Sequence, residues 1–370
     1  MMQSKLVTFP STDAEVKRKP MNQLSIPDNY EQAERQFIQL LETEELDNKL
    51  AAELISTSSF ERAVATAIEA AYIGASGDDA AHQFLQRVLY HINRLKLFWY
   101  DDLRHYTNER SLYLRRIRDQ IEETWQQWEA EQLYRAAYQG IDVRQALIDR
   151  VAADLDPPLS DDNLFFRNQV TESGYRRLVA IASLDGLVEA SQLSRALGGV
   201  GNEVHAVLTR LLIEEYGGGR LARKHSSHFT TMLEHLGMET EPEAYFDIVP
   251  WEVLAIINHS FLLTERKRYF LRYMGGLLYG ELSVPASFRN YQIAGERLGL
   301  SAAAMSYWNL HIKVDELHGR WMLDDVALPL VAQYPVDAWE LVFGYDQQRL
   351  LSDRAGAAVA RAAREADQTP

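Results

Sequence analysis

Cysteine is absent from the sequence. Disulfide bonds, thiolate zinc sites, iron–sulfur clusters and cysteine nucleophiles are therefore excluded. Any metal site in this chain must be built from histidine, aspartate and glutamate. Those side chains suit iron, manganese or zinc.

Positive charge is also scarce. Lysine and arginine number 38 against 53 acidic residues, which gives a formal net charge of −15 at pH 7. Such a surface repels the phosphates of nucleic acids and of anionic lipids. We therefore expect neither a nucleic acid nor a membrane surface as a partner.

Long apolar runs are missing. The longest candidate, VLAIINHSFLL, contains Asn258 and His259 and falls short of the roughly 20 residues that span a bilayer. Residues 1–20 carry scattered charges and no apolar core of a signal peptide. The sequence predicts a soluble, cytoplasmic protein.

Hydrophobic residues make up 46% of the 370 positions, which is enough for two domains with separate cores. They recur mostly at helical spacing, and no strand alternation or βαβ rhythm is evident. The sequence therefore predicts an all-α protein. We expect helices at about 29–55, 58–75, 79–98, 107–137, 143–154, 171–197, 201–216, 225–237, 250–282, 286–298 and 301–331.

Four parts are expected along the chain. They are a disordered lead-in at 1–28, an N-terminal helical domain at 29–155, a second helical domain at 165–335 and a C-terminal tail at 337–370. The linker DLDPPLSDDN at 154–163 separates the two domains, since its paired prolines and acidic run cannot continue a helix. The tail is expected to hold an Ala- and Arg-rich helix that then frays.

One segment of the N-terminal domain is long, amphipathic and rich in opposite charges, NERSLYLRRIRDQIEETWQQWEAEQLYRAAY. We favour a solvated bundle helix with surface ion pairs. A dimer interface is the alternative, although a strict coiled-coil seam is missing.

The sequence HIKVDELH places three potential metal ligands, His311, Asp315 and His318, at helical spacing. A helix turns by about 100° per residue, so the three side chains share one narrow face. The two histidines lie about 10 Å apart along the axis, too far to chelate one ion comfortably. The triplet therefore suits two adjacent metals with the carboxylate between them. The same face continues toward a core at Ala304, Tyr307 and Met322.

The Asp-x-x-His spacing by itself is weak evidence for a metal site. It recurs at Asp79/His82 and Asp102/His105, and a buried His–Asp pair can simply be a satisfied polar contact. We expect His82 to be a surface residue whose replacement leaves metal binding unchanged.

Two glutamates extend apolar helical stripes. Glu281 follows Met274, Leu277 and Leu278, and Glu215 follows Leu208, Leu211 and Leu212, whereas Glu214 fits its stripe less well. A buried glutamate is costly unless it is paired, protonated or bound to a metal. Both stripes therefore indicate carboxylates at a functional site.

Two further candidate metal ligands follow the sequence YGGGR, which interrupts the helical pattern. They are His225 and His228, three residues apart in KHSSHF. One of the two can face Glu215 across the break. Glu189, in DGLVEASQL, has the weakest pattern and is compatible with an ordinary surface position. The Glu-x-x-His pairs typical of ferritin-like sites are absent.

Three blocks in order, IEEYGGGRLARKHSSHFTTMLEHLGM, YFLRYMGGLLYGELS and HIKVDELHGRWM, resemble the haem-oxygenase-like di-iron oxidases and oxygenases. Within that family they resemble the N-oxygenase branch, including the central domain of the N-oxygenase of streptozotocin biosynthesis. The resemblance covers about residues 165–335. It implies a haem-oxygenase-like helical bundle, and it implies homodimerisation through the N-terminal helical domain.

The resemblance also implies seven metal ligands: Glu189, Glu215, His225, Glu281, His311, Asp315 and His318. Glu215 would bridge the two irons, and Glu281 would be the extra carboxylate of this branch. These two are the expected catalytic carboxylates. His228 would be a packing residue or would support a ligand.

The implied activity is O₂-dependent oxygenation of an amine, guanidine or amino-heterocycle nitrogen in a small metabolite of natural-product biosynthesis. The implied cofactors are two Fe(II)/Fe(III) ions, with O₂ as co-substrate, a peroxo-di-iron(III) intermediate and an external electron donor. The short tail leaves no room for the cupin domain that completes the streptozotocin enzyme's chemistry, so formation of a nitrogen–nitrogen bond is not expected.

Two alternatives remain open at this point. Relatives of this fold desaturate or cleave amino acids and fatty acids. A protein of another class, a non-catalytic helical partner-binding protein, would carry the histidine cluster by accident.

Overall fold

The computed structural model describes residues 28–74, 77–98, 102–199 and 201–369 of the chain. Over these residues the chain is helical and has no β-strand, which confirms the prediction of an all-α protein. The predicted lead-in, apart from residue 28, lies outside the described residues.

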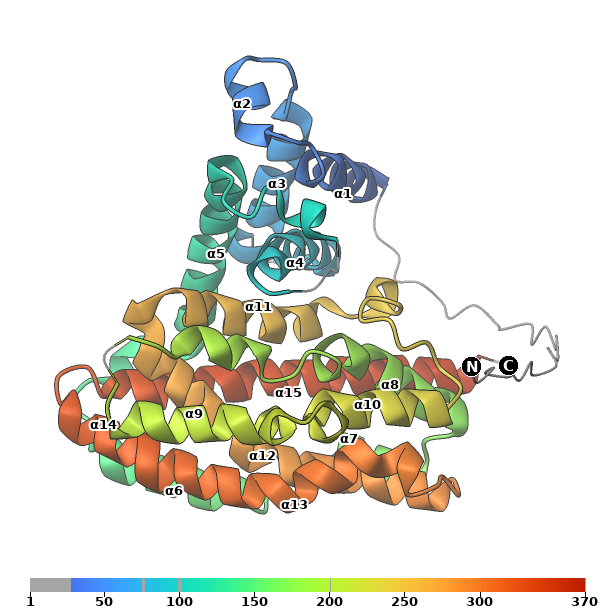
Figure 1. Cartoon of the computed structure of the whole chain (residues 1–370), viewed down its shortest axis with the longest axis vertical. Helices are drawn as coiled ribbons and strands as arrows, with labels where there is room; N and C mark the ends of the chain where they lie inside the picture. The colour runs from blue at the N-terminus through green and yellow to red at the C-terminus, as the bar shows by residue number, and fades with distance from the viewer. Residues whose placement is uncertain (1–27, 75–76, 99–101, 200, 370) are drawn as a thin grey trace, which may run out of the picture.

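The first helices form a small layer of their own, at the top of Figure 1. Its core contains two pairs of stacked aromatic rings, Phe37 with Phe60 and Tyr30 with Phe84. The layer consists of α1 (Asp28–Leu41), α2 (Leu46–Ala51), α3 (Ser58–Ile68), α4 (Asp79–Asn93) and the upper part of α5 (Leu112–Gln132). The predicted helix at 29–55 is divided, because Glu45 adopts a left-handed backbone conformation with φ of 53° before α2.

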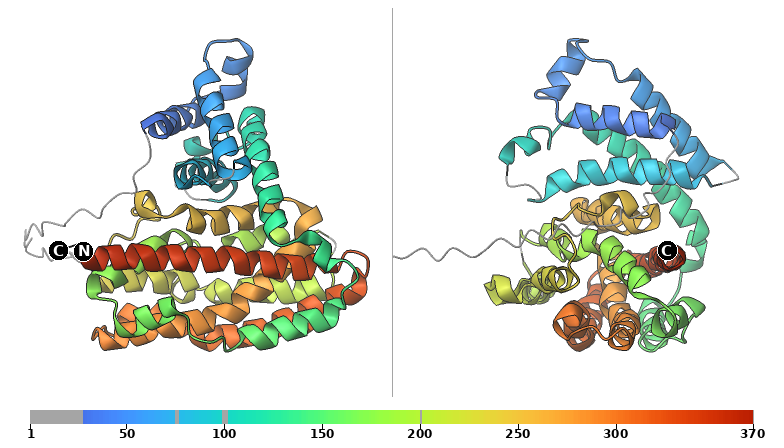
Figure 2. Two further views of the ribbon diagram at one scale, coloured as in Figure 1. Left: turned by 180° about the vertical axis from the view of Figure 1, so that it is seen from behind. Right: turned by 90° about the vertical axis from the view of Figure 1, so that its right-hand side faces the viewer.

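The second part is a larger helical bundle (Figures 1 and 2). It contains α6 (Val143–Asp154), α7 (Asp161–Asn168), α8 (Glu172–Gly186), α9 (Glu203–Glu215), α10 (His225–His235), α11 (Trp251–Glu265), α12 (Phe270–Arg297), α13 (Ser306–Trp321), α14 (Leu328–Gln333) and α15 (Trp339–Gln368). Helix α4 packs on α11, so α11 joins the two parts. Helix α7 begins inside the predicted linker. The Ser160 hydroxyl caps this helix by accepting a hydrogen bond from the backbone N–H of Asn163.

The break between the two long helices α11 and α12 lies elsewhere than predicted. We expected it between residues 282 and 286, next to Pro285. The chain instead breaks at the extended residue Arg266, and α12 continues through Pro285. Proline cannot donate the backbone hydrogen bond to the carbonyl of Glu281. The contacts of α12 with α13 and α15 therefore outweigh this local disadvantage.

The segment assigned to the C-terminal tail forms α15, a 30-residue helix that reaches Gln368. Figure 2 shows it running the length of the bundle, and it packs along α12 and α8. Close contact with α12 depends on two glycines. A Cβ atom on Gly275 would lie 1.9 Å from the Leu341 carbonyl oxygen, and one on Gly344 would lie 2.0 Å from that of Arg272. The predicted helix is therefore present, but it is long and forms part of the bundle.

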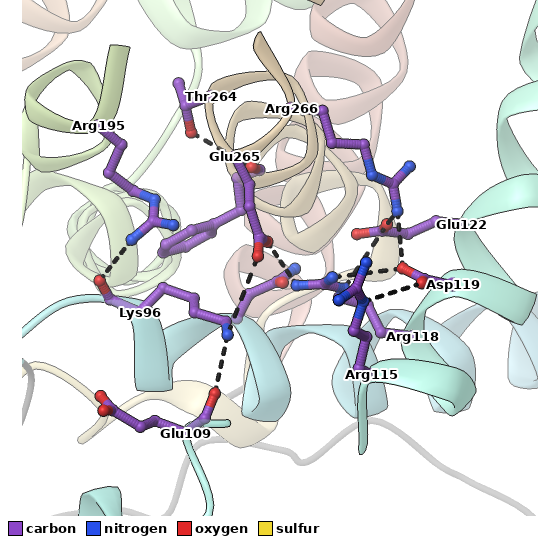
Figure 3. A network of polar contacts seen from close by, with 12 residues as sticks. Lys96, Glu109, Arg115, Arg118, Asp119, Glu122, Arg195, Thr264, Glu265 and Arg266 are labelled. Atoms are coloured by element: carbon purple, nitrogen blue, oxygen red, sulfur yellow. Dashed lines mark hydrogen bonds and ion pairs between the residues drawn. The ribbon is translucent and has the colours of Figure 1, made fainter. Parts of the chain in front are cut away.

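A network of charges connects α5 to the end of α11 (Figure 3). Arg118 contacts Glu265, and Arg266 contacts Glu122 and, at 2.9 Å, Asp119. Arg118 and Glu122 are almost fully buried, with 5% and 2% of their side chains exposed. Burial raises the pKa of Glu122 to about 7, although the neighbouring arginines Arg266 and Arg118 oppose the shift.

This network gives a stability prediction. Arg118→Met should lower the free energy of unfolding by about 3 kcal/mol, because the buried Glu122 and the partly buried Glu265 each lose one of their paired cations. Arg115→Met is the matched control on the same helix. Its side chain is 69% exposed and pairs with Asp119 at 3.5 Å, so the loss should stay below about 0.5 kcal/mol. Urea unfolding followed by circular dichroism measures both, and equal losses would contradict the prediction.

The expectation that His82 is a surface residue is wrong. Only 2% of it is exposed, and its ring stacks on Trp251 at a centroid distance of 4.3 Å. Asp79 accepts a hydrogen bond from the Trp251 indole at 3.2 Å. This Asp-x-x-His pair therefore serves packing between α4 and α11. His105 of the other pair is exposed.

Within the described part of the chain, none of the helices combines the length and apolar character that a membrane crossing requires.

Candidate metal centre

The predicted ligands come from five places in the bundle that fold toward one another. Glu189 lies in the turn after α8, Glu215 ends α9, and His225 begins α10. Glu281 lies on α12, and the triplet lies on α13. The structure brings all seven side chains together.

The glycines of YGGGR bring Glu215 and His225 together. Gly217, Gly218 and Gly219 all have positive φ angles, between 61° and 77°, which side chains with a Cβ rarely adopt. A Cβ on Gly217 would also lie 2.4 Å from the backbone of Arg223. The chain therefore reverses within a few residues, and Glu215 Oε2 comes within 2.7 Å of His225 Nδ1.

The first group of potential ligands comprises Glu189, Glu215, His225 and His311, which offer ligand atoms within 4.8 Å of one another. His311 Nε2 lies 3.0 Å from Glu189 Oε1 and 3.1 Å from His225 Nδ1. Four groups with two imidazoles and two carboxylates are a donor set suited to iron.

The second group comprises Glu215, Asp315 and His318 within the same limit. His318 Nδ1 lies 3.6 Å from Asp315 Oδ1, and Glu281 Oε2 adds a further carboxylate oxygen 3.3 Å from the same nitrogen. Glu215 belongs to both groups. Its Oε2 faces His225, and its Oε1 lies 3.4 Å from His318 Nδ1.

The triplet on α13 spans the two groups. All three residues are buried, so the prediction of a shared, core-facing helix surface is confirmed. His311 belongs to the first group, while Asp315 and His318 belong to the second. This division agrees with the helical spacing, which placed the two histidines too far apart for one ion.

The ring nitrogens that point away from the cluster orient the two histidines of α13. His311 Nδ1 lies 2.8 Å from the Tyr307 carbonyl oxygen, so it donates a hydrogen bond there and leaves the Nε2 lone pair facing the first group. His318 Nε2 lies 3.3 Å from Glu214 Oε2, which leaves Nδ1 facing the second group. Both rings are therefore held with one nitrogen directed at the cluster, where a metal ion could replace its proton.

The electrostatics show that the cluster needs positive charge. Burial, followed by repulsion from Glu281, raises the pKa of Asp315 to about 9. Burial and the nearby Glu189 and Glu281 also raise the pKa of Glu215 well above its usual range. Burial opposes protonation of His311, but Glu189 and other carboxylates raise its pKa to about 10. Without cations, the cluster must hold protons to offset its negative charge.

Unpaired atoms give an independent test of whether these residues fit a metal. Glu189 Oε2, Asp315 Oδ1 and His318 Nδ1 are buried and make no hydrogen bond of acceptable geometry within the described residues, although carboxylate oxygens lie 3.3–3.6 Å from His318 Nδ1. Such atoms are rare in folded proteins. Each belongs to one of the two groups and carries a lone pair that a cation can accept. The residues therefore fit metal ions.

A cavity of about 260 Å³ opens beside the cluster. Glu189, Glu215, Glu281, His311 and Asp315 form part of its wall, and apolar residues form another part: Ile256, Ile257, Leu263 and Leu277. A second cavity of about 610 Å³ shares part of that wall. A small molecule in the first cavity would contact the cluster directly.

Sequence reasoning missed three residues of this site. The Tyr307 hydroxyl donates to Glu189 Oε1 at 2.7 Å, Glu214 contacts His318, and Asp185 lines both cavities. Helical spacing placed Tyr307 on the face of the triplet, one turn before His311, but did not indicate its contact with Glu189. Glu214 was not predicted as a ligand, because it fits the apolar stripe of α9 less well than Glu215. Its side chain is half-exposed, and only the carboxylate at its tip reaches the cluster. His228 belongs to neither group, in keeping with the packing role expected of it.

Comparisons with known proteins agree with the predicted resemblance. Residues 176–351 match a haem-oxygenase-related family described as iron-containing redox enzymes. Nitrosourea synthase from Streptomyces achromogenes subsp. streptozoticus is 29% identical over 168 residues, which cover 45% of this chain and 36% of that protein. The match thus spans about a third of the relative's length.

All seven predicted ligands lie inside the matched segment, and the match speaks against a non-catalytic protein with an accidental histidine cluster. Residues 176–351 belong to the haem-oxygenase-like family of iron-containing redox enzymes.

Proposed function

We propose that this chain is a non-haem di-iron, O₂-dependent N-oxygenase. Its substrate would be an amine, guanidine or amino-heterocycle nitrogen of a small metabolite, within natural-product biosynthesis. The observation that carries the proposal is the pair of ligand groups that share Glu215 at the wall of a cavity. One carboxylate with an oxygen directed to each group is suited to bridging two metal ions.

The charge of the cluster supports two ions rather than one. Glu189, Glu215, Glu281 and Asp315 carry up to four negative charges when ionised, and two ferrous ions would neutralise them. Neutral imidazoles from His225, His311 and His318 complete the set. Bound there, two iron ions would supply the electrons that activate O₂, with an external reductant restoring the ferrous state.

The protein's own contribution is to hold the ligands and to exclude water. Tyr307 fixes Glu189 through its hydroxyl and fixes His311 through its carbonyl oxygen. Phe288 packs against His311 at a ring-centroid distance of 5.6 Å and also lines the cavity. These contacts leave little freedom in the first group, and the apolar wall protects a reactive oxygen species from quenching by water.

Nitrogen as the site of oxidation is supported by two observations. The relative's name, nitrosourea synthase, denotes a product with an oxidised nitrogen. In this chain, the residues that line the 260 Å³ cavity include no lysine or arginine. A fatty acid would lack a cationic anchor there, whereas an amine would not need one.

Oxygen uptake with a substrate panel tests the proposal. The full chain is loaded anaerobically with Fe(II) and exposed to O₂ and a reductant with amino acids, guanidines, amino-heterocycles or fatty acids. Amine-type substrates should stimulate uptake and gain oxygen from labelled O₂ on nitrogen. Oxygen on carbon, desaturation, or stimulation by fatty acids alone would contradict N-oxygenation.

A further inference from the structure

A carboxylate outside the ligand set faces the space where substrate would lie. Asp185 is on the last turn of α8, one turn before Glu189. Its side chain is accessible, and the surface that it exposes lines both the 260 Å³ and the 610 Å³ cavities. Asp185 therefore stands where the two cavities meet, beside the cluster.

The side chain of Asp185 has no hydrogen bond or ion pair with any of the residues that the structure describes. Although Asp185 is accessible from the two cavities, the protein that encloses them shields its carboxyl from bulk water, and this burial, with repulsion from Glu189, raises its pKa to about 7. Its position near the C-terminus of α8 adds a further cost, because the helix dipole there disfavours an anion and favours a cation. The surroundings of the Asp185 carboxylate thus disfavour its negative charge, and its side chain makes no internal contact that would offset this.

Cations are scarce around Asp185. No lysine or arginine is among the described residues that line the smaller cavity. The larger cavity has Arg349, which pairs with Asp154 at 3.4 Å. The acidic residue Asp162 at the same cavity pairs with Arg364 at 2.7 Å. Asp353 at the larger cavity also has no ion pair among the described residues, but it does not line the cavity beside the cluster. Of these two carboxylates, Asp185 is therefore the one whose charge a ligand beside the cluster can neutralise.

We propose that Asp185 determines substrate specificity by forming an ion pair with a cationic nitrogen group of the substrate. This inference rests on the proposed function and narrows its substrate class to small molecules that carry an ammonium or guanidinium group. The apolar part of the molecule lies against Ile256 and Ile257, which both cavities share. The ion pair holds the substrate beside Glu189 and the metal cluster.

Binding of two matched probes tests the role of Asp185. The iron-loaded full chain is titrated anaerobically with n-butylammonium and with n-butanol, which has the same apolar chain but no charge. The wild-type protein should bind n-butylammonium at least about tenfold more tightly, because only the cation pairs with the carboxylate. Equal affinities in the wild-type protein would overturn the inference, even if no variant could be made.

Asp185→Asn should weaken binding of n-butylammonium by about thirtyfold and leave n-butanol binding unchanged. The control Asp162→Asn lines the larger cavity but removes a carboxylate that is already paired, so both affinities should stay within about twofold of wild type. With an amine substrate, Asp185→Asn should raise KM and change kcat little, as expected for a contact that persists through the reaction.

Iron content separates failure of this inference from failure of the proposed function. Asp185→Asn should retain the wild-type number of iron ions, because Asp185 lies outside both ligand groups. Unchanged n-butylammonium binding in an iron-loaded, active variant would overturn the role of Asp185 alone. Loss of n-butylammonium and n-butanol binding together would indicate a structural role and would also overturn it.

Discussion

Glu215→Gln is expected to abolish binding of both metal ions. The carboxylate directs Oε2 to the first group and Oε1 to the second, and a neutral amide cannot replace an anion that contacts two cations. The affinity for Fe(II) should fall by more than about 100-fold, beyond the 10- to 100-fold typical of losing a supporting contact. Anaerobic equilibrium dialysis with iron analysis measures the loss, and circular dichroism should show unchanged helix content.

A control lies on the same helix. Glu203→Gln changes an exposed glutamate at the start of α9 and should leave iron binding unchanged. His311→Ala and Asp315→Ala give a finer test, since each removes a ligand from one group only. Each should lose one ion in preference to the other. A Glu215→Gln protein that still binds two ions would show that the shared carboxylate is not a ligand.

Gly275→Ala is expected to have the largest effect on stability. The added methyl group would lie 1.9 Å from the Leu341 carbonyl oxygen, which belongs to the backbone of α15 and cannot rotate away. Helices α12 and α15 must then separate, and about 3 kcal/mol or more of the free energy of unfolding should be lost. Chemical denaturation followed by circular dichroism measures this loss.

Gly356→Ala is the matched control for Gly275→Ala, because it makes the same substitution on α15. A Cβ there meets no atom within 4 Å, so the better helix propensity of alanine should stabilise the protein by about 0.5–1 kcal/mol. The two substitutions should therefore have opposite signs. Destabilisation of similar size at both sites would mean that the close contact of α12 and α15 is not what Gly275 provides.

The sequence predicted the site best where ligands stand on regular helices. Helical spacing placed His311, Asp315 and His318 on one buried face, and apolar stripes identified Glu215 and Glu281. Glu189 lies in a turn, where the spacing of residues along the sequence does not show which way a side chain points. Only the family resemblance therefore identified it. Asp185 was missed because an aspartate on a helix gives no sign, in sequence, of the cavity that it faces.

Fold errors arose where local signals competed with packing. The predicted helices stopped at 282 and resumed at 286, on either side of Pro285, but contacts of α12 with its neighbours keep the helix continuous. Arg266 gave no signal for the break that does occur. The C-terminal tail was expected to hold an Ala- and Arg-rich helix that then frays, and its small residues gave no sign of a place in the bundle. They are instead buried against the bundle, as Ala355, Ala358, Ala360 and Ala363 show.

Mössbauer spectroscopy of the wild-type protein tests the central claim, that one chain holds two irons joined by Glu215. The full chain is loaded anaerobically with isotopically enriched Fe(II), freed of excess metal, and oxidised with O₂. We predict two irons per chain and a spectrum of a magnetically coupled diferric pair, because a shared carboxylate keeps the ions adjacent. One iron or less per chain, or a spectrum of isolated ferric ions, would contradict the account.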